Sequence, residues 1–472
     1  MTSLLLAALI LAGSENNNTG MPLTDPLNWW VYMEETASGT AMPGILPLRR
    51  NPIRSEETGD LNPELENLLL RRSSFPLSTE GDDGLLNFSG TAAGQLLSHS
   101  GGTETRIGGT LRLFVLPLPN LYLDEQLSLW AGSDENPPDH FSPFHDGMEK
   151  GRHLYVDRGY LRWSIPAVSV SLGRIPQRWG PGRFTQLLLS DNSPPLDMLK
   201  VQFRLPSAGL EFTGFTATVD SDSGTYLTAH RLDITPFRQL RIGLSESILF
   251  KSAGLDLAYM NPFIPWYPVQ WNERVDDNAF MVIDLSWLPF RGFETYGELL
   301  LDDFQYENEG NRPDKIGFTA GMSGWLARAE IGAVVEYTRI DRYVYAQRRK
   351  CNYYLHHDDI IGSGLGPDAD RITLSVAESA TWPLLAEVRV HHTRHGEGTV
   401  QEGWPDSAST GGKFPSGVVE HTTGAALNLS WYPLEMLDIL GSLQQSWVRN
   451  AEHVSGAEDS RFSASLEIFC NW

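Results

Sequence analysis

Residues 259–280, YMNPFIPWYPVQWNERVDDNAF, combine flat aromatic rings with amide and charged side chains. Aromatic faces can pack against the C–H groups of a sugar ring, while carboxylate, amide and guanidinium groups can bond its hydroxyl groups. This composition makes the stretch a candidate carbohydrate-binding loop. An equally good interpretation is that the rings only pack the loop or lie at a membrane interface. The candidate sugar-binding residues are Trp266, Tyr267, Trp271, Asn272, Arg274 and Asp276.

Three other polar stretches have side chains that bind metals. LDDFQYENEG at 301–310 offers oxygen ligands for Ca²⁺, but its spacing is not that of an EF-hand. HHDD at 356–359 and HHTRH at 391–395 offer imidazoles. Neighbouring residues on a strand point to opposite faces, so His391 and His392 cannot both bind one ion from regular β geometry. We interpret these stretches as solvated polar segments and predict no metal and no cofactor.

The chain does not contain a recognisable nucleophile motif, so we expect a protein without catalytic activity. Its formal net charge of -23 argues against nucleic acid as a partner, because a phosphate backbone would be repelled. Its two cysteines, Cys351 and Cys470, cannot build a disulfide framework.

The first residues, MTSLLLAALILAGSENNN, contain a nine-residue apolar run from Leu4 to Ala12. The run is followed by small residues and an Asn tract, which predicts a secretory signal peptide over residues 1–14. No basic residue precedes it, and a buried N-terminal segment is the alternative. Elsewhere no apolar run approaches the length of a spanning helix, so a closed β-barrel is the one form in which this chain could cross a membrane.

The C-terminal segment RFSASLEIFCNW alternates apolar and polar residues and ends on Trp472. The same period of two recurs at 281–287, 384–391 and 425–432, with charged residues such as Asp284 and Glu387 on the polar face. A wet lumen accommodates such charges better than a dry sandwich core does. The pattern therefore favours a transmembrane antiparallel barrel over a soluble all-β sandwich or propeller.

Four segments read as strand, tight turn with Pro, strand: 161–174, 232–247, 285–299 and 429–443. In three of them a Trp precedes the Pro, where an interfacial girdle residue would lie. Long polar stretches separate these hairpins, and bacterial outer-membrane barrels have the same asymmetry of short periplasmic turns and long outer loops. The predicted long loops are 131–153, 258–278, 303–314, 343–370 and 394–420.

Residues 15–83 do not alternate, and NPELENLLLRR at 62–72 has the capping pattern of a helix. We predict a small helical plug there, followed by a barrel over 84–472 with about 16–20 strands, 18 being the best single figure. If the lumen were open instead, the chain would be a porin conducting small solutes. Its predicted lumen-lining residues are Asp284, Glu298, Glu336, Glu387 and Arg389.

A rigid and basic stretch, RIPQRWGPGRFTQLLLSDNSPP, occupies residues 174–195 of this acidic chain. Its prolines stiffen it, and Gly180 and Gly182 permit tight turns or close backbone approach. Arg174, Arg178 and Arg183 would either form a site for acidic polysaccharide or neutralise acids in the lumen, and we favour the second slightly. The rigidity suits a plug or a gate.

This stretch resembles the capsule-assembly family typified by Wzi, whose members carry an Arg, a Trp-Gly-Pro-Gly turn, a Leu-rich run ending in Ser and an Asn-x-x-Pro stop. ETYGELLLDDF at 294–304, HHDDIIGSGLGPDADR at 356–371 and PGILPLRRNPIRSEE at 43–57 also look similar to this family. The residues that match the main motif are Arg174, Trp179, Gly180, Pro181, Gly182, Leu187, Leu188, Leu189, Ser190, Asn192 and Pro195.

The resemblance implies an outer-membrane barrel plugged by helices, which acts as a lectin and ties capsular or other surface polysaccharide to the cell. The expected partners are then that polysaccharide, outer-membrane lipid and the barrel assembly machinery, and the expected location is the bacterial outer membrane. The outer loops do not align with the family pattern, so the resemblance does not carry over the ligand.

Overall fold

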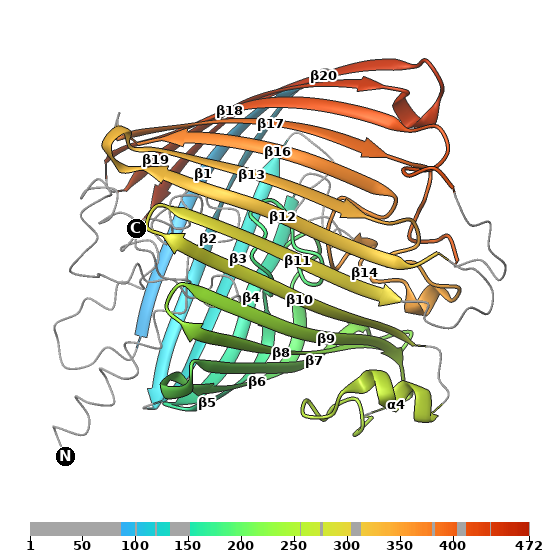
Figure 1. Ribbon diagram of the computed structural model, residues 1–472. Coiled ribbons are helices and arrows are strands. Elements are labelled where there is room, and N and C mark those ends of the chain that lie inside the picture. Colours follow the sequence, from blue (N-terminus) through green and yellow to red (C-terminus); the bar gives the residue numbers. More distant parts are fainter. Residues whose placement is uncertain are drawn as a thin grey trace.

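The computed structural model describes residues 86–99, 102–118, 120–132, 152–254, 256–273, 277–303, 313–379, 383–403, 412–434 and 436–471. They form one antiparallel sheet of 18 strands that closes into a barrel (Figure 1). Each strand pairs with its neighbour in the chain, and β1 closes the barrel by pairing with β20, for example at Thr91 and Asn471. Both the predicted class and the strand number are confirmed.

The barrel strands have the following bounds: β1 Leu86–His99, β2 Gly102–Leu118, β3 Leu121–Gly132, β4 Arg152–Ile165, β5 Val168–Ile175, β6 Leu196–Leu205, β7 Leu210–Asp220, β8 Thr225–Phe237, β9 Leu240–Lys251, β10 Asn278–Phe290, β11 Phe293–Asp303, β12 Lys315–Leu326, β13 Ile331–Ile340, β16 Ala369–Glu378, β17 Leu384–His395, β18 Glu420–Leu434, β19 Leu437–Arg449 and β20 Glu458–Asn471. A small hairpin of β14 (Leu355–His356) and β15 (Asp359–Ile360) stands apart from this sheet.

Alternating residues of each strand face outward, as the period of two predicts. In β10, Met281, Ile283 and Trp287 are 39–47% exposed, whereas Asp284 beside them is 1% exposed. The apolar residues thus form the outer surface and the polar ones face the interior. This is the reverse of a soluble protein and matches a lipid-facing wall.

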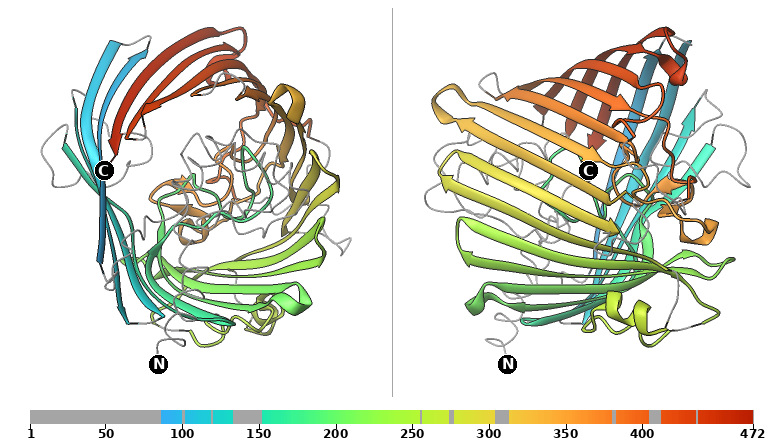
Figure 2. Two further views of the ribbon diagram at one scale, coloured as in Figure 1. Left: turned by 90° about the vertical axis from the view of Figure 1, so that its left-hand side faces the viewer. Right: turned by 45° about the vertical axis from the view of Figure 1, so that its right-hand side comes forward.

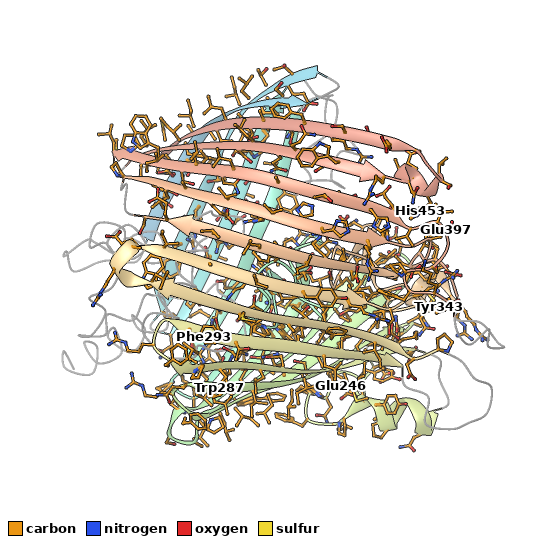
Figure 3. All side chains as sticks on the ribbon, turned by 45° about the horizontal axis from the view of Figure 1, so that its top comes forward. Glu246, Trp287, Phe293, Tyr343, Glu397 and His453 are labelled. Carbon is orange, nitrogen blue, oxygen red and sulfur yellow. The ribbon has the colours of Figure 1, made fainter. Side chains whose placement is uncertain are left out.

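The two ends of the barrel differ (Figure 3). Tight turns join the strands at the end where Trp287 and Phe293 lie, and long connections leave the end where Tyr343, Glu397 and His453 lie. The four predicted Pro-containing hairpins are confirmed as β4–β5, β8–β9, β10–β11 and β18–β19. By the asymmetry of outer-membrane barrels, the turn end is periplasmic and the long-loop end is extracellular.

Helical structure is sparse in the described part of the chain. It comprises α4 (Trp266–Glu273) and four short 3-10 turns, η2 (Pro206–Ala208), η3 (Ala327–Ala329), η4 (Lys350–Asn352) and η5 (Ala451–His453). Among these described helices, none has the length and apolar character needed to cross a bilayer. The predicted signal peptide and helical plug, residues 1–14 and 15–83, lie outside the described residues.

Candidate functional site: the luminal loops and the outer face

Residues 176–195, the first luminal loop, connect β5 to β6 through the interior of the barrel (Figure 2). The loop folds back on itself, because the Trp179 amide donates to the Leu189 carbonyl at 2.9 Å. Leu187, Leu188 and Leu189 are at most 2% exposed. The segment that sequence analysis singled out for its rigidity therefore lies inside the lumen.

The glycines of the first luminal loop are required by its close approach to the wall. Gly180 has φ +115°, and a Cβ there would lie 2.7 Å from an oxygen of Glu298. A Cβ on Gly182 would lie 1.9 Å from the carbonyl oxygen of Thr185. Only glycine permits both positions without a shift of the backbone.

Residues 341–368, the second luminal loop, also enter the lumen, between β13 and β16 (Figure 2). The Tyr345 hydroxyl donates to the Leu187 carbonyl at 2.5 Å and the Tyr354 hydroxyl to the Leu188 carbonyl at 3.0 Å. The Ser190 amide donates to the Ile361 carbonyl at 3.0 Å. The two loops thus form one interlocked unit. The prediction that 343–370 is an external loop is wrong for the part that contains Tyr345 and Tyr354, because these two side chains are buried against the first luminal loop.

Acidic residues of the wall hold the first luminal loop by its backbone. Glu336 accepts hydrogen bonds from the amides of Arg183 (2.5 Å) and Phe184 (3.2 Å), and Glu298 accepts one from the amide of Leu187 at 3.1 Å. Glu294 pairs with the Arg183 guanidinium. A carboxylate that accepts backbone N–H groups satisfies donors that would otherwise be buried without partners.

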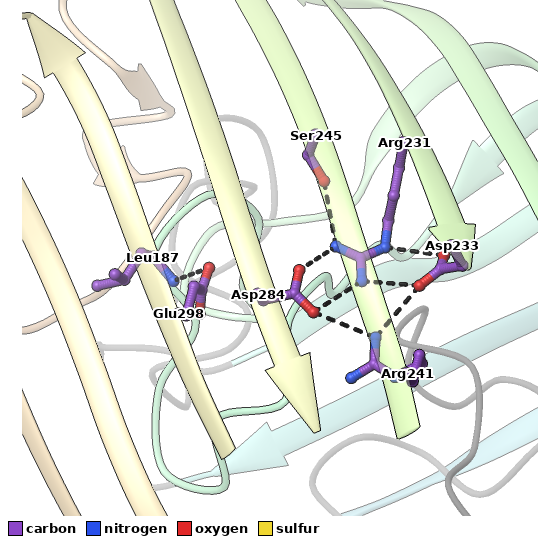
Figure 4. Close-up of polar contacts among 7 residues, drawn as sticks. All are labelled: Leu187, Arg231, Asp233, Arg241, Ser245, Asp284 and Glu298. Carbon is purple, nitrogen blue, oxygen red and sulfur yellow. Dashed lines mark hydrogen bonds and ion pairs between the residues drawn. The ribbon is translucent and has the colours of Figure 1, made fainter. Parts of the chain in front are cut away.

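A second buried cluster joins β8, β9 and β10 beside this loop (Figure 4). Arg231 is fully buried and contacts Asp233 at 2.8 Å and Asp284 at 2.5 Å. Arg241 lies 3.2 Å from both carboxylates. The positive charges of the two arginines therefore neutralise the negative charges of the two aspartates. An unpaired charge at such a buried position would destabilise the fold.

The three arginines of the stretch 174–195 have different partners. Arg183 neutralises Glu294, and Arg178 donates to Gln186 at 2.5 Å inside the loop. Arg174 pairs with Asp197 at 2.9 Å at the start of the loop. Sequence analysis offered two roles for these arginines, binding of acidic polysaccharide or neutralisation of acids in the lumen. The second role fits Arg183, because Arg183 pairs with Glu294 inside the barrel.

The predicted lumen residues differ in how far they are buried, because the side chains of Glu387 and Arg389 remain 16% and 39% exposed. Asp284, Glu298 and Glu336 are 1–3% exposed. Glu387 bonds Arg389, whose guanidinium lies 5.1 Å from the ring centre of Phe184 in the first luminal loop. The porin interpretation expected all five residues to line open water, and the three buried acids do not.

The predicted sugar-binding loop lies near the extracellular end, with part of it in α4. Trp266 is fully buried, with its ring 4.2 Å from that of His230, and its amide donates to Glu246 at 3.0 Å. Tyr267 is half-buried, and its amide also donates to Glu246. Asn272 is exposed. Arg274, Asp276 and the side chain of Trp271 lie outside the described residues. Trp266 is thus a packing residue in this structure.

The histidine and acidic stretches do not assemble a metal site within the described ranges. His356 is buried and its Nδ1 lies 2.9 Å from the Val219 carbonyl oxygen, so Nδ1 carries the proton. Burial lowers the pKa of His356 to about 4. Asp302, from the acidic stretch 301–310 that we interpreted as solvated, is buried and pairs with Lys315 at 2.5 Å.

A cluster at the extracellular end, which we call the outer cluster, consists of Arg342, Tyr343 and Glu402. Arg342 donates to Glu402 through Nε (2.9 Å) and Nη2 (2.5 Å), and its guanidinium carbon lies 5.3 Å from the Tyr343 ring centre. Glu402 raises the pKa of Arg342, and burial raises that of the Tyr343 hydroxyl. Sequence analysis missed this cluster, because its members are 60 positions apart and no motif links them.

Comparisons with known proteins agree with this architecture. The structure is similar to that of Wzi from Escherichia coli, described as an outer-membrane protein involved in group 1 capsule assembly and a carbohydrate-binding β-barrel. The TM-score is 0.64 at 16% identity over 95% of this chain and 99% of that chain. It is also similar to OprD of Pseudomonas aeruginosa, with a TM-score of 0.50 at 9% identity over 84% of this chain and 98% of that chain.

No curated protein matches the chain. The family model described as capsule assembly protein Wzi matches residues 80–461, which include the Trp-Gly-Pro-Gly turn and both luminal loops. The chain therefore belongs to the Wzi family of capsule assembly proteins.

Proposed function

We propose that this outer-membrane barrel holds capsular or other surface polysaccharide at its extracellular end and acts without catalysis. The observation that carries the proposal is the interlocked pair of luminal loops, joined by the hydrogen bond from Tyr345 to Leu187. A barrel whose interior is occupied by its own chain presents its outer face as the surface for a ligand. The related Escherichia coli protein, described as carbohydrate-binding, has the same fold.

The contacts of the lumen acids favour this function over conduction. A cation-selective pore needs carboxylates that face water. Here Glu298 and Glu336 accept hydrogen bonds from the backbone of the first luminal loop instead. Moving that loop aside would leave these amides and the Arg183 charge to find new partners, which is costly in a buried setting.

The other partners that we propose are supported by the surface of the barrel and by its charge. The exposed apolar residues of its wall suit outer-membrane lipid, and the alternating β20 suits recognition by the barrel assembly machinery. The net charge of -23 disfavours nucleic acid. A glycan, by contrast, is bound through hydroxyl groups and C–H faces and does not require a basic protein.

The test is direct binding. The full chain, refolded into lipid nanodiscs, would be immobilised and exposed to surface polysaccharide purified from the cells that produce it. We expect saturable binding, with nanodiscs that lack protein as the control. An absence of binding at millimolar sugar concentration, together with steady ion conductance, would replace this proposal with the porin function.

A further inference from the structure

The second luminal loop holds several residues other than glycine in the left-handed backbone region. Tyr345 has φ +68° and Asp368 has φ +59°. Both are explained by their contacts, since Tyr345 bonds Leu187 and Asp368 accepts from the amides of Gly398 (3.0 Å) and Ser416 (3.0 Å). In each case the surrounding hydrogen bonds offset the strain of the backbone.

Tyr343 is different. Its φ is +84°, which is unfavourable for a bulky side chain. Its side chain is partly exposed, and within the described residues its hydroxyl has no hydrogen-bond partner. The turn that closes with the Val344 amide donating to the Asp341 carbonyl at 3.3 Å holds this backbone, and it projects the Tyr343 ring beside Arg342. Strained residues of this kind gather at ligand-binding sites, where the conformation presents a side chain to a partner.

The neighbours of Tyr343 supply polar groups in a fixed arrangement. Arg342 and Glu402 form a two-point ion pair, and their side chains remain 37% and 32% exposed. Their free edges offer hydrogen-bond donors and acceptors side by side. An aromatic face next to such a pair is the combination that hydroxyl-rich ligands require.

The outer cluster is held in place from beneath. Asp368 is buried and anchors the amide of Gly398, and a Cβ on Gly398 would lie 3.0 Å from Cγ of Arg342. The Glu402 amide donates to Thr399 at 3.1 Å, and Val400 packs against the buried core of the luminal loops. The cluster is therefore preorganised, which lowers the entropic cost of binding.

We infer that the outer cluster is a subsite for one neutral, hydroxyl-rich sugar unit of the bound polysaccharide. The sugar ring stacks on Tyr343, and two neighbouring hydroxyl groups bond Arg342 and Glu402. This inference rests on the proposed function. It adds the location of the binding site and the chemical class of the sugar unit. A uronate is disfavoured, because its carboxylate would compete with Glu402 for Arg342 and would be repelled by the nearby negative charge of Asp368.

The test uses Tyr343→Gly in the binding assay described above. Glycine adopts φ +84° freely, so the variant keeps the backbone and loses only the ring. We expect binding to weaken about tenfold or more, the loss of one good contact. The matched control is His357→Gly, an exposed residue of the same loop at φ +51°, which should bind like the wild type.

A second pair of ligands tests the class of sugar. Carboxyl-reduced polysaccharide, in which each uronate has become a neutral hexose, should bind within about threefold of the native glycan. If carboxyl reduction of the polysaccharide weakens its binding by about tenfold or more, the inference that the subsite takes a neutral sugar is wrong. A melting curve checks that Tyr343→Gly folds. If it does not, Tyr343→Asn is used, because Asn tolerates the same backbone region.

The results distinguish a failure of the proposed polysaccharide binding from a failure of the subsite at the outer cluster. If the wild type does not bind the polysaccharide, the proposed function fails. If the wild type binds and Tyr343→Gly binds equally well, the function stands and the subsite at the outer cluster is wrong. If Tyr343→Gly weakens binding and His357→Gly does not, both are supported.

Discussion

The hydroxyl of Tyr345 donates a hydrogen bond to the carbonyl oxygen of Leu187 across 2.5 Å and so ties together two loops that are 158 residues apart in the sequence. The same hydroxyl accepts the amide of Ser363 at 3.2 Å. One buried side chain therefore satisfies a backbone acceptor in the first luminal loop and a backbone donor in the second. This contact joins the two luminal loops inside the barrel.

Tyr345→Phe should loosen the first luminal loop without unfolding the barrel. The change leaves a buried carbonyl and a buried amide unpaired, which costs roughly 1–3 kcal/mol. Hydrogen exchange followed by mass spectrometry should show faster exchange in 185–190 and unchanged exchange in β19 and β20. The control is Tyr353→Phe, whose hydroxyl makes only a 3.4 Å contact with Gln401. Equal protection in wild type and Tyr345→Phe would contradict this role.

Glu336→Leu should let the first luminal loop leave the wall intermittently. It removes the acceptor of the Arg183 and Phe184 amides and of the Tyr296 hydroxyl. We expect brief current steps in planar bilayers. Glu467→Leu is the control, because Glu467 lies five strands away on β20 and bonds Gln95 of β1. Currents of equal frequency in both variants would mean that the loop does not depend on Glu336.

Gly243→Ala should destabilise the barrel through a single methyl group. A Cβ at this position would lie 2.0 Å from Nη2 of Arg231 and 2.5 Å from Oδ2 of Asp284, so the buried ion pairs must separate. Breaking such a cluster costs about 3–5 kcal/mol. The midpoint of urea unfolding in lipid vesicles should fall. Gly94→Ala, also within a strand but with no atom within 4 Å of its Cβ, should leave the midpoint nearly unchanged.

The docking of the β14–β15 hairpin should weaken in acid. His356 has a pKa of about 4 in the folded protein against an ordinary value of 6.5, because burial disfavours its charged form. The released hairpin therefore binds a proton more readily than the docked one. The contribution of neutral His356 to the docking free energy of the hairpin is fully present above pH 6.5. It falls by about 1.4 kcal/mol per pH unit as the pH is lowered from 6.5 to 4. NMR titration of the His356 ring should give a midpoint near pH 4, whereas a midpoint near 6.5 would refute the burial.

Sequence analysis predicted the wall of the barrel because the lipid imposes its pattern on every strand. Met281, Ile283 and Trp287 alternate with Asp284, and no distant contact is needed to assign their faces. The Pro-containing turns were predictable for the same reason, since the geometry of a hairpin is local. The outer-membrane class and the family followed from this pattern and from the Trp-Gly-Pro-Gly turn.

The interior could not be predicted in the same way. Whether a long connection turns outward or into the lumen depends on contacts such as that between Tyr345 and Leu187, which no local pattern records. The burial of Trp266 depends on His230 and Glu246, which lie on β8 and β9. The left-handed backbone of Tyr343, inside the turn from Asp341 to Val344, likewise has no signature in the sequence, because tyrosine is not a residue that marks such a position.

The most direct measurement is the single-channel conductance of the intact chain in a planar bilayer. Insertion would be verified independently by protease protection of the reconstituted barrel. A lumen closed by the two luminal loops predicts no steady current at moderate voltage. A steady, ohmic and cation-selective current from the intact wild-type chain would contradict the closed lumen and would identify the barrel as a porin.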